Sequence, residues 1–172
     1  MKAVLALGAN LGDRAATLQA ALDGLGAQTR VVAVSAIFET APVGGPSQPD
    51  FYNAVVLVDT TLAATDLLTL AHSLEAAAGR VRVEHWGPRT LDVDVLAYDD
   101  KRSDDPELTL PHPRAHERAF VVLPWLEVEP DGAIDGYGTL AELATKLGTA
   151  GVRRRDTPML RHPTLRPRGG GT

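Results

Sequence analysis

The chain has 172 residues, 44% of them apolar and 23% charged, which is the composition of a single globular domain. It contains no cysteine, so disulfides and thiolate zinc sites are excluded, and no apolar run approaches the roughly 20 residues of a membrane span. The net charge is −5, but residues 153–172 hold six arginines against one aspartate, so the first 152 residues carry about −10. We therefore expect a cytoplasmic protein with no membrane partner and, because its acidic part repels nucleic acid, no nucleic-acid partner.

Strand and helix patterns alternate over the first 98 residues. An apolar strand over 2–8 ends at Gly8, and Asp13 or Asn10 is placed to cap a following helix that stops at Gly26. The further expected elements, in chain order, are a strand over 30–38, a loop over 41–50 rich in proline and glycine, a strand over 51–60, a helix over 62–78 ended by Gly79, and a strand over 90–98.

Shorter elements are expected after residue 98. Residues 99–107 form an acidic loop, and a helical stretch begins near His116, where Pro124 must end or kink it. Thr139-Leu140-Ala141-Glu142 is a capping box for a last helix that ends at Gly148. The remainder is rich in arginine, proline and glycine and has little to bury. We therefore expect a domain over 1–152 and a basic, disordered tail over 153–172.

The order strand, helix, strand, strand, helix, strand predicts the α+β class. It is the order of a ferredoxin-like β-α-β-β-α-β sheet with helices packed on one face, here followed by further C-terminal helices. The opposite face of the sheet would then be free to act as a binding surface. A doubly wound parallel sheet fits less well, because the strands over 30–38 and 51–60 follow each other with no helix between them.

Two aspartates, Asp92 and Asp94, alternate with aliphatic residues in the strand over 90–98. The period of a strand places them on one face, about 7 Å apart at the backbone, with Leu91, Val93 and Val95 on the other. Paired carboxylates suit hard divalent cations, and crowding them in an apolar strand costs energy unless a cation is present. The pair predicts a magnesium–nucleotide site; the alternative is two solvated residues on an exposed strand face.

Basic residues near the aspartates are candidates to contact phosphate groups. A Gly-Pro turn brings Arg89 to the start of the strand, and Arg80 and Arg82 follow Gly79, which suits an arm that closes over phosphates. Arg118 is a further candidate, and His112 lies between two prolines in a rigid, extended segment. The alternative for each is an ordinary surface arginine or loop histidine.

Aromatic residues near the candidate loops could sandwich a flat heterocycle. They are Phe38, Phe51, Tyr52, Trp86 and Phe120, and the amide of Asn53 could pair with the edge of such a ring. Neither G-x-G-x-x-G nor G-x-x-x-x-G-K-[ST] occurs in the chain. Side chains and a metal, not a glycine-rich loop, would therefore hold a nucleotide.

Several short segments follow one another over about residues 1–150. They are Gly8-Ala9-Asn10-Leu11-Gly12, Thr40-Ala41-Pro42-Val43-Gly44, Asp50-Phe51-Tyr52-Asn53, Gly79-Arg80-Val81-Arg82, Trp86-Gly87-Pro88-Arg89-Thr90-Leu91-Asp92-Val93-Asp94, Leu110-Pro111-His112-Pro113-Arg114 and Arg118-Ala119-Phe120. Together they resemble the 6-hydroxymethyl-7,8-dihydropterin pyrophosphokinase family of folate biosynthesis. The Gly-Pro-Arg-x-x-Asp-x-Asp core is highly specific when the other segments accompany it.

The resemblance implies the ferredoxin-like fold and transfer of a diphosphate from ATP to the pterin hydroxymethyl group, with release of AMP. Asp92 and Asp94 would be the ligands of two Mg²⁺ ions that bridge the triphosphate, and Asp94 would also reach the substrate hydroxyl side. Arg80, Arg82 and Arg89 would act with Asp94 in catalysis. The loops 42–50 and 80–89 would close over ATP and the reduced pterin and exclude water.

The resemblance also implies a residue set for each substrate. The set for ATP is His72, Glu75, Arg80, Arg82, Trp86, Arg89, Val95, Thr109, His112 and Arg118. The set for the pterin is Thr40, Pro42, Val43, Asn53, Trp86 and Phe120. The chain departs from the family pattern at Phe51, where tyrosine can occur, at Val83, where a basic residue can occur, and at Pro113, where an aromatic can touch adenine. These departures bear on affinity and loop closure.

Two other functions stay open. A different metal-dependent phosphotransferase on the same sheet would transfer the γ-phosphoryl group and release ADP instead of AMP. A non-catalytic nucleotide- or RNA-binding protein is suggested by the basic tail, against the acidic charge of the rest of the chain. No long apolar surface stripe is left over, so a monomer is expected.

Overall fold

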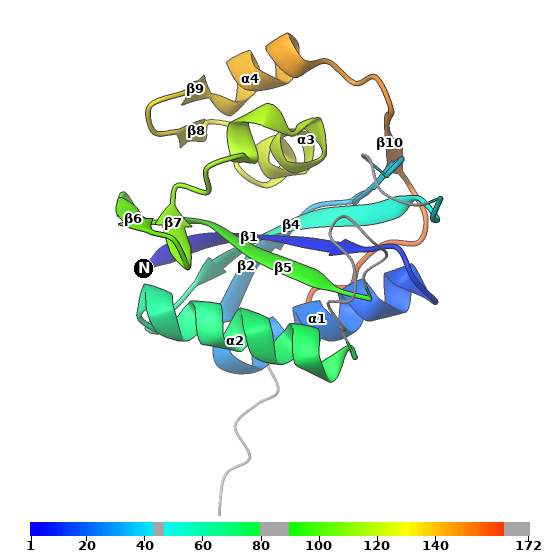
Figure 1. The fold of residues 1–172 in the computed structure, drawn as a ribbon, viewed down its shortest axis with the longest axis horizontal. Helices are drawn as coiled ribbons and strands as arrows, with labels where there is room; N and C mark the ends of the chain where they lie inside the picture. Colours follow the sequence, from blue (N-terminus) through cyan, green and yellow to red (C-terminus); the bar gives the residue numbers. More distant parts are fainter. Residues whose placement is uncertain (43–46, 80–89, 164–172) are drawn as a thin grey trace, which may run out of the picture.

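The computed structural model describes residues 1–42, 47–79 and 90–163. Its centre is an antiparallel sheet (Figure 1) made of β1 (Lys2–Ala9), β2 (Arg30–Val34), β3 (Ile37–Thr40), β4 (Phe51–Asp59), β5 (Asp92–Tyr98) and β10 (Val152–Arg155). The strand order is β10-β3-β4-β1-β5, and β2 also pairs with β4. The helices are α1 (Arg14–Gln28), α2 (Ala64–Ala77), α3 (Ala119–Val128) and α4 (Leu140–Leu147). This mixture confirms the predicted α+β class.

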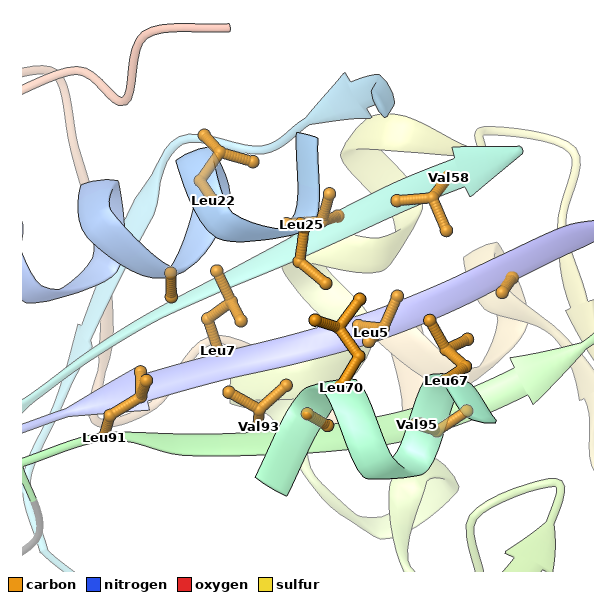
Figure 2. Packing of buried hydrophobic residues seen from close by; sticks show 14 of the residues in the cluster. Leu5, Leu7, Leu22, Leu25, Val58, Leu67, Leu70, Leu91, Val93 and Val95 are labelled. Carbon is orange, nitrogen blue, oxygen red and sulfur yellow. The ribbon is translucent and has the colours of Figure 1, made fainter. Parts of the chain in front are cut away.

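One face of the sheet packs against α1 and α2. Leucines of the two helices meet aliphatic residues of the central strands in a continuous core, and Figure 2 shows these side chains pointing toward one another. The core includes Leu5, Leu7, Leu22, Leu25, Val58, Leu67, Leu70, Leu91, Val93 and Val95. Each fully buried side chain of this kind contributes about 1.5–3 kcal/mol relative to an exposed one, so this core fixes the positions of β1, β4 and β5.

The other face is partly covered by α3, with α4 packed on α3 (Figure 1), so the expectation that this face would be free is wrong for the part under α3. Trp125 and Val122 of α3 are buried in a second core with Val4 and Val55 of the sheet. Helix α3 is apolar around most of its circumference, and such a helix must be covered on more than one side. It lies over β3 and β4, while Asp92 and its surroundings stay half-buried.

Two helices run through residues that were expected to stop or disturb them. Helix α1 continues past Gly26 to Gln28, and a Cβ on Gly26 would lie only 2.7 Å from Pro163, so this glycine allows a close contact instead of ending the helix. Helix α3 continues past Pro124 to Val128, because its buried apolar residues outweigh the one missing backbone hydrogen bond. The strand expected over 30–38 is split into β2 and β3.

The segment after β5 is more regular than expected. The acidic stretch contains a hairpin of β6 (Ser103–Asp105) and β7 (Leu108–Leu110), followed by a 3₁₀ turn over Ala115–Glu117. A second small hairpin, β8 (Ala133–Ile134) with β9 (Gly138–Thr139), precedes α4. The predicted capping box is confirmed, since Thr139 and Glu142 exchange two hydrogen bonds of 3.1 Å, and α4 ends at Gly148 as predicted.

The basic C-terminal segment was expected to be disordered from residue 153, and for residues 153–155 this is wrong. They belong to β10, which pairs with β3 at the edge of the sheet. Arginines that looked unpaired in the sequence bind acidic residues distant in the chain, Arg153 and Arg155 at Glu39 and Arg154 at Glu127. Residues 164–172 lie outside the described part. None of the helices in the described residues is long and apolar enough to cross a membrane.

Candidate active site

Neighbouring residues of adjacent strands form the floor of the candidate site. Asn53 of β4 and Asp92 of β5 both pair with Gly8 of β1, and Phe38 of β3 pairs with Asn53. Opposed residues of an antiparallel sheet point to the same face, so Asn53 and Asp92 stand two strand spacings, roughly 10 Å, apart on that face. A Cβ on Gly8 would lie 3.4 Å from Asn53 Oδ1. The glycine therefore leaves open space between an amide and a carboxylate.

The alternation predicted for β5 is confirmed. Val93 and Val95 are buried against α1 and α2, at 3% and 4% exposure, whereas Asp92 and Asp94 are half-buried on the opposite face. Two residues along a strand separate the aspartates by about 7 Å at the backbone. Val95, expected to line the nucleotide pocket, has its side chain in the core, so only its main chain is left to face a nucleotide.

The segment that follows β7 brings two basic residues to the aspartates. The backbone N–H of His112 donates to the carbonyl of Leu96 in β5 (2.9 Å), and Arg118 immediately precedes α3. Burial and the charge of Arg118 lower the pKa of His112, and the charge of Asp92 opposes them. Burial lowers the pKa of Arg118, with Arg114 adding to the effect and both aspartates opposing it. The charge of Asp92 therefore acts on His112, and the charges of both aspartates act on Arg118.

Of the residues expected to bind a pterin, Asn53 and Thr40 lie together at one end of the floor. Asn53 is buried, and its Nδ2 donates to the carbonyl of Phe38 and to Oγ1 of Thr40, both at 3.1 Å. Pro42 and Phe120 are half-buried, and the Phe120 ring centroid lies 5.7 Å from the Arg118 guanidinium carbon. Phe120 therefore lies beside a residue that also feels the charge of the aspartates.

The remaining residues expected at the nucleotide lie away from the floor. Glu75 of α2 is buried, and its Oε1 accepts a hydrogen bond from the N–H of Val93 (2.9 Å), which ties α2 to the edge strand β5. His72 is exposed on α2, and Thr109 is half-buried in β7, where its hydroxyl donates to the carbonyl of Asp105 (2.9 Å). The structure thus gives Glu75 and Thr109 clear structural contacts.

Several predicted residues fall outside the described part of the chain. They are Val43, Arg80, Arg82, Trp86 and Arg89, together with the departure at Val83. Of the other departures, Phe51 is half-buried at the start of β4 and Pro113 is exposed. Tyr52, one of the aromatics considered for stacking, is buried on the α1 side and so points away from the floor.

The carboxylate pair suits magnesium. Within residues 1–42, 47–79 and 90–163, no group of three or more His, Asp or Glu side chains could hold a metal ion together. Mg²⁺ does not require such a group, because it is usually bound by one or two carboxylates, substrate phosphates and waters. Asp92 and Asp94 supply hard oxygen donors, and the charges of both aspartates act on the nearby Arg118.

Sequence reasoning missed the role of Asn10. Its side chain is 1% exposed, and Nδ2 donates to Oε1 of Gln48 (2.8 Å) and to the carbonyl of Pro49 (3.1 Å). It thereby holds the end of the loop 41–50 against the turn after β1. A polar residue between a buried strand and a helix was interpreted only as a possible cap, and Asp13 makes that cap instead.

A groove of about 580 Å³ lies between α1 and α2, on the opposite side of the sheet from the aspartates. Alanines make up much of its described lining, and Asp13, the one ionisable residue among those described, is engaged as the cap of α1. None of the residues expected to bind ATP or a pterin that the structure describes lines this groove. The arrangement of carboxylates, basic groups and amide on the sheet face is therefore the better candidate.

Comparison with known proteins identifies the family of the chain. The fold is similar to that of the Plasmodium falciparum HPPK-DHPS triple mutant with pteroate, with a TM-score of 0.69 and 16% identity over 89% of this chain and 46% of that one. This chain thus spans less than half of that larger one. The chain belongs to the 7,8-dihydro-6-hydroxymethylpterin-pyrophosphokinase (HPPK) family, whose model matches residues 4–130.

Relatives named 2-amino-4-hydroxy-6-hydroxymethyldihydropteridine pyrophosphokinase match over nearly their whole length. The one from Methylorubrum extorquens is 46% identical over 89% of this chain and 98% of its own. The one from Mycobacterium tuberculosis is 40% identical over 95% of this chain and 92% of its own. The family match over residues 4–130 includes every described residue of the candidate site.

Proposed function

We propose that the protein transfers diphosphate from ATP to the hydroxymethyl group of 6-hydroxymethyl-7,8-dihydropterin, producing the pterin diphosphate and AMP in folate biosynthesis. The single observation that carries this proposal is the floor itself, where Asn53 and Asp92 flank Gly8 in a chain of the HPPK family. An amide suits the edge of a pterin, and a carboxylate suits the metal-bound phosphates that must approach its hydroxymethyl group.

Asn53 would orient the pterin ring. Its Nδ2 is committed to Phe38 and Thr40, so Oδ1 is the atom that is directed toward the open space at Gly8. A pterin carries N–H donors along one edge, and a fixed acceptor discriminates in favour of that edge because a lost hydrogen bond leaves a buried group unsatisfied. Thr40, Pro42, Val43 and Phe120 would complete this half of the site, with Phe120 and Trp86 covering the ring.

Asp92 and Asp94 would hold two Mg²⁺ ions with the triphosphate. Bound Mg²⁺ supplies charge neutralisation and alignment for in-line displacement at phosphorus. Asp94 lies two residues after Asp92, on the same face of β5, and would face the hydroxyl that attacks the β-phosphorus. His112 and Arg118 would hold phosphate oxygens, and burial and the charge of Arg118 lower the pKa of His112.

The other proposed nucleotide residues form two groups. Glu75, His72, Val95 and Thr109 belong to the α2–β5–β7 side of the sheet, and Arg80, Arg82, Trp86 and Arg89 belong to the arm that would close over the phosphates. In this proposal Arg80, Arg82 and Arg89 act with Asp94 in transfer. Closure of both loops would exclude the water that otherwise hydrolyses ATP.

We further infer a ferredoxin-like sheet over the first 98 residues, which the antiparallel order β3-β4-β1-β5 supports. A monomer in the cytoplasm is proposed on the sequence grounds given above, with the domain extended beyond residue 152 to include β10.

The test is incubation of the protein with ATP, Mg²⁺ and the reduced pterin, followed by separation of the nucleotides. AMP formed in proportion to pterin consumed is the expected result. Formation of ADP would favour γ-phosphoryl transfer, and no pterin-dependent turnover would favour a binding protein. Omitting Mg²⁺, with chelator present, should abolish AMP formation.

A further inference from the structure

Glu39 of β3 is the centre of an arginine cluster on the α1 side of the sheet. Its side chain is 11% exposed, and Oε2 accepts hydrogen bonds from Arg153 (2.8 Å) and Arg155 (2.7 Å) of β10. The strand register explains this, because Arg153 pairs with Glu39 and Arg155 with Ile37, two residues apart on one face. The bond from Arg153 lowers the pKa of Glu39, and Arg155 adds to this effect although burial opposes both. Strand β10 thus holds Glu39 as a carboxylate.

Arg14, the first residue of α1, connects this cluster to the loop 41–50. Its Nη1 lies 3.8 Å from Oε1 of Glu39 and donates to the carbonyl of Asp50 at 2.8 Å. Its guanidinium carbon lies 3.9 Å from the ring centroid of Tyr52, which restricts where the group can point. Asp50 ends the loop and leads directly into β4, which carries Asn53. Arg14 therefore fixes the backbone at the entry to the pterin half of the site.

The same nitrogen of Arg14 has two acceptors within reach. It makes its hydrogen bond to the neutral carbonyl of Asp50, although a carboxylate oxygen of Glu39 is near and is the stronger kind of acceptor. This choice is understandable because Arg153 and Arg155 both bind Oε2 of Glu39 and offset its negative charge, which weakens the pull of Oε1 on Arg14. If they were removed, the carboxylate without these partners would draw Arg14 away from Asp50.

We propose that Arg153 and Arg155 are positioning residues for the pterin site, which act by satisfying Glu39 so that Arg14 stays bound to the carbonyl of Asp50. This inference rests on the pterin-binding function proposed above. Strand β10 lies beyond residues 4–130 of the family match, so the family motifs do not account for it. Strand β10 then supports pterin binding, although it contributes no residue to the site floor.

The test compares steady-state kinetics of variants for each substrate separately. The double variant Arg153→Ala/Arg155→Ala should raise the KM for the pterin by about fivefold, the effect of losing one hydrogen bond, with the KM for ATP changed by less than about twofold. Adding Glu39→Gln to this double variant removes the competing carboxylate and should restore the pterin KM. Arg153→Lys/Arg155→Lys should retain most of the wild-type KM, because the positive charge stays.

Arg154→Ala is the matched control. It lies on the same strand but points to the other face, where it pairs with Glu127, so it removes an ion pair without affecting Glu39. Its pterin KM should equal that of the wild type. Thermal unfolding of each variant checks folding, and the single variant Arg153→Ala serves if the double variant does not fold.

An unchanged pterin KM in the double variant would overturn the proposal. So would an equal increase in Arg154→Ala, or failure of Glu39→Gln to restore the KM, since either result indicates general loosening of the sheet edge. If the wild type itself forms no AMP, the proposed function fails and this inference fails with it. Failure of the proposed function and failure of this inference alone are distinguishable, because the variant outcomes can be measured only if the wild type is active.

Discussion

At the scale of single residues, Gly8 matters because it has no side chain. It separates Asn53 from Asp92, and a Cβ at this position would lie 3.4 Å from Asn53 Oδ1, which is an ordinary contact that the fold tolerates. Gly8→Ala should therefore fold with nearly unchanged thermal stability but raise the KM for the pterin about tenfold, because a small displacement of a bound reactant is costly. Steady-state kinetics with varied pterin, alongside a melting curve, measure both effects. A pterin KM within about twofold of the wild type would show that the ring does not lie over Gly8.

Asp92 and Asp94 are expected to be needed for turnover, not for folding. Changing either to Asn keeps its shape but removes the charge that would bind Mg²⁺, so kcat should fall by at least about 10²-fold while the melting temperature stays equal or rises. The control is Asp100→Asn, since Asp100 is exposed in the turn that follows β5. Rates measured over a range of Mg²⁺ concentrations test this directly. Wild-type turnover at limiting Mg²⁺ in either variant would disprove the metal assignment.

The aspartates could be placed from sequence because the period of a strand is fixed. Once β5 was recognised, one face had to hold Asp92 and Asp94 and the other Val93 and Val95. The approach of His112 and Arg118 to the pair depends on the long path from β5 through the β6–β7 hairpin, which no local pattern encodes. The role of Asn10 was missed for the same reason, since its partners lie 38 and 39 residues further along the chain.

At the scale of elements, the pairing of β3 with β10 has a consequence for stability. The pKa of Glu39 is lowered from 4.5 by its arginine partners, so its contribution to stability is present above about pH 4.5 and is lost as pH falls through the lowered pKa. Glu39→Gln should reduce the free energy of unfolding by about 1–2 kcal/mol at pH 7, and the difference from the wild type should shrink toward pH 3.

Denaturant unfolding at several pH values measures this difference. The exposed Glu107 offers a control, because Glu107→Gln should leave the pH dependence of unfolding unchanged. A constant difference between Glu39→Gln and the wild type from pH 7 to pH 3 would contradict the assignment of Glu39 as a charged partner of β10.

Elements with a strong period could be predicted, while their ends and partners could not. Helix α1 passes through Gly24 and Gly26. Glycine is needed there because a side chain would collide with Leu74 or Pro163, and these contacts exist only in the folded chain. Strand β10 was missed because its arginines carry no strand pattern, and they become ordered only where Glu39 and Glu127 meet them.

At the scale of the whole molecule, the sheet has two unequal faces. One is covered by α1 and α2, and the other is partly covered by α3 with α4 packed on it (Figure 1), while Gly8 and Asp92 are half-buried. The order of elements correctly predicted that α1 and α2 cover the same face of the sheet. It could not predict that α3, although it contains Pro124, would fold back over β3 and β4, because that depends on the total apolar surface that the helix has to bury.

The partial cover has a functional consequence. It leaves a floor whose Asn53 end would receive the pterin and whose Asp92 end would receive the metal-bound triphosphate, so the hydroxymethyl group and the β-phosphorus meet over Gly8. A site arranged in this way favours attack on the β-phosphorus over the γ-phosphorus only if both substrates are held at once. The rival phosphotransferase would release ADP from the same site.

The most direct test of this account uses ATP labelled at the β-phosphate. The protein is incubated with labelled ATP, Mg²⁺ and 6-hydroxymethyl-7,8-dihydropterin, and the label is followed in the separated nucleotides and pterins. The account predicts that the label moves to the pterin product as part of a diphosphate, with an equal amount of unlabelled AMP. Label retained in ADP beside a pterin monophosphate would contradict it, as would label released from ATP at the same rate without the pterin.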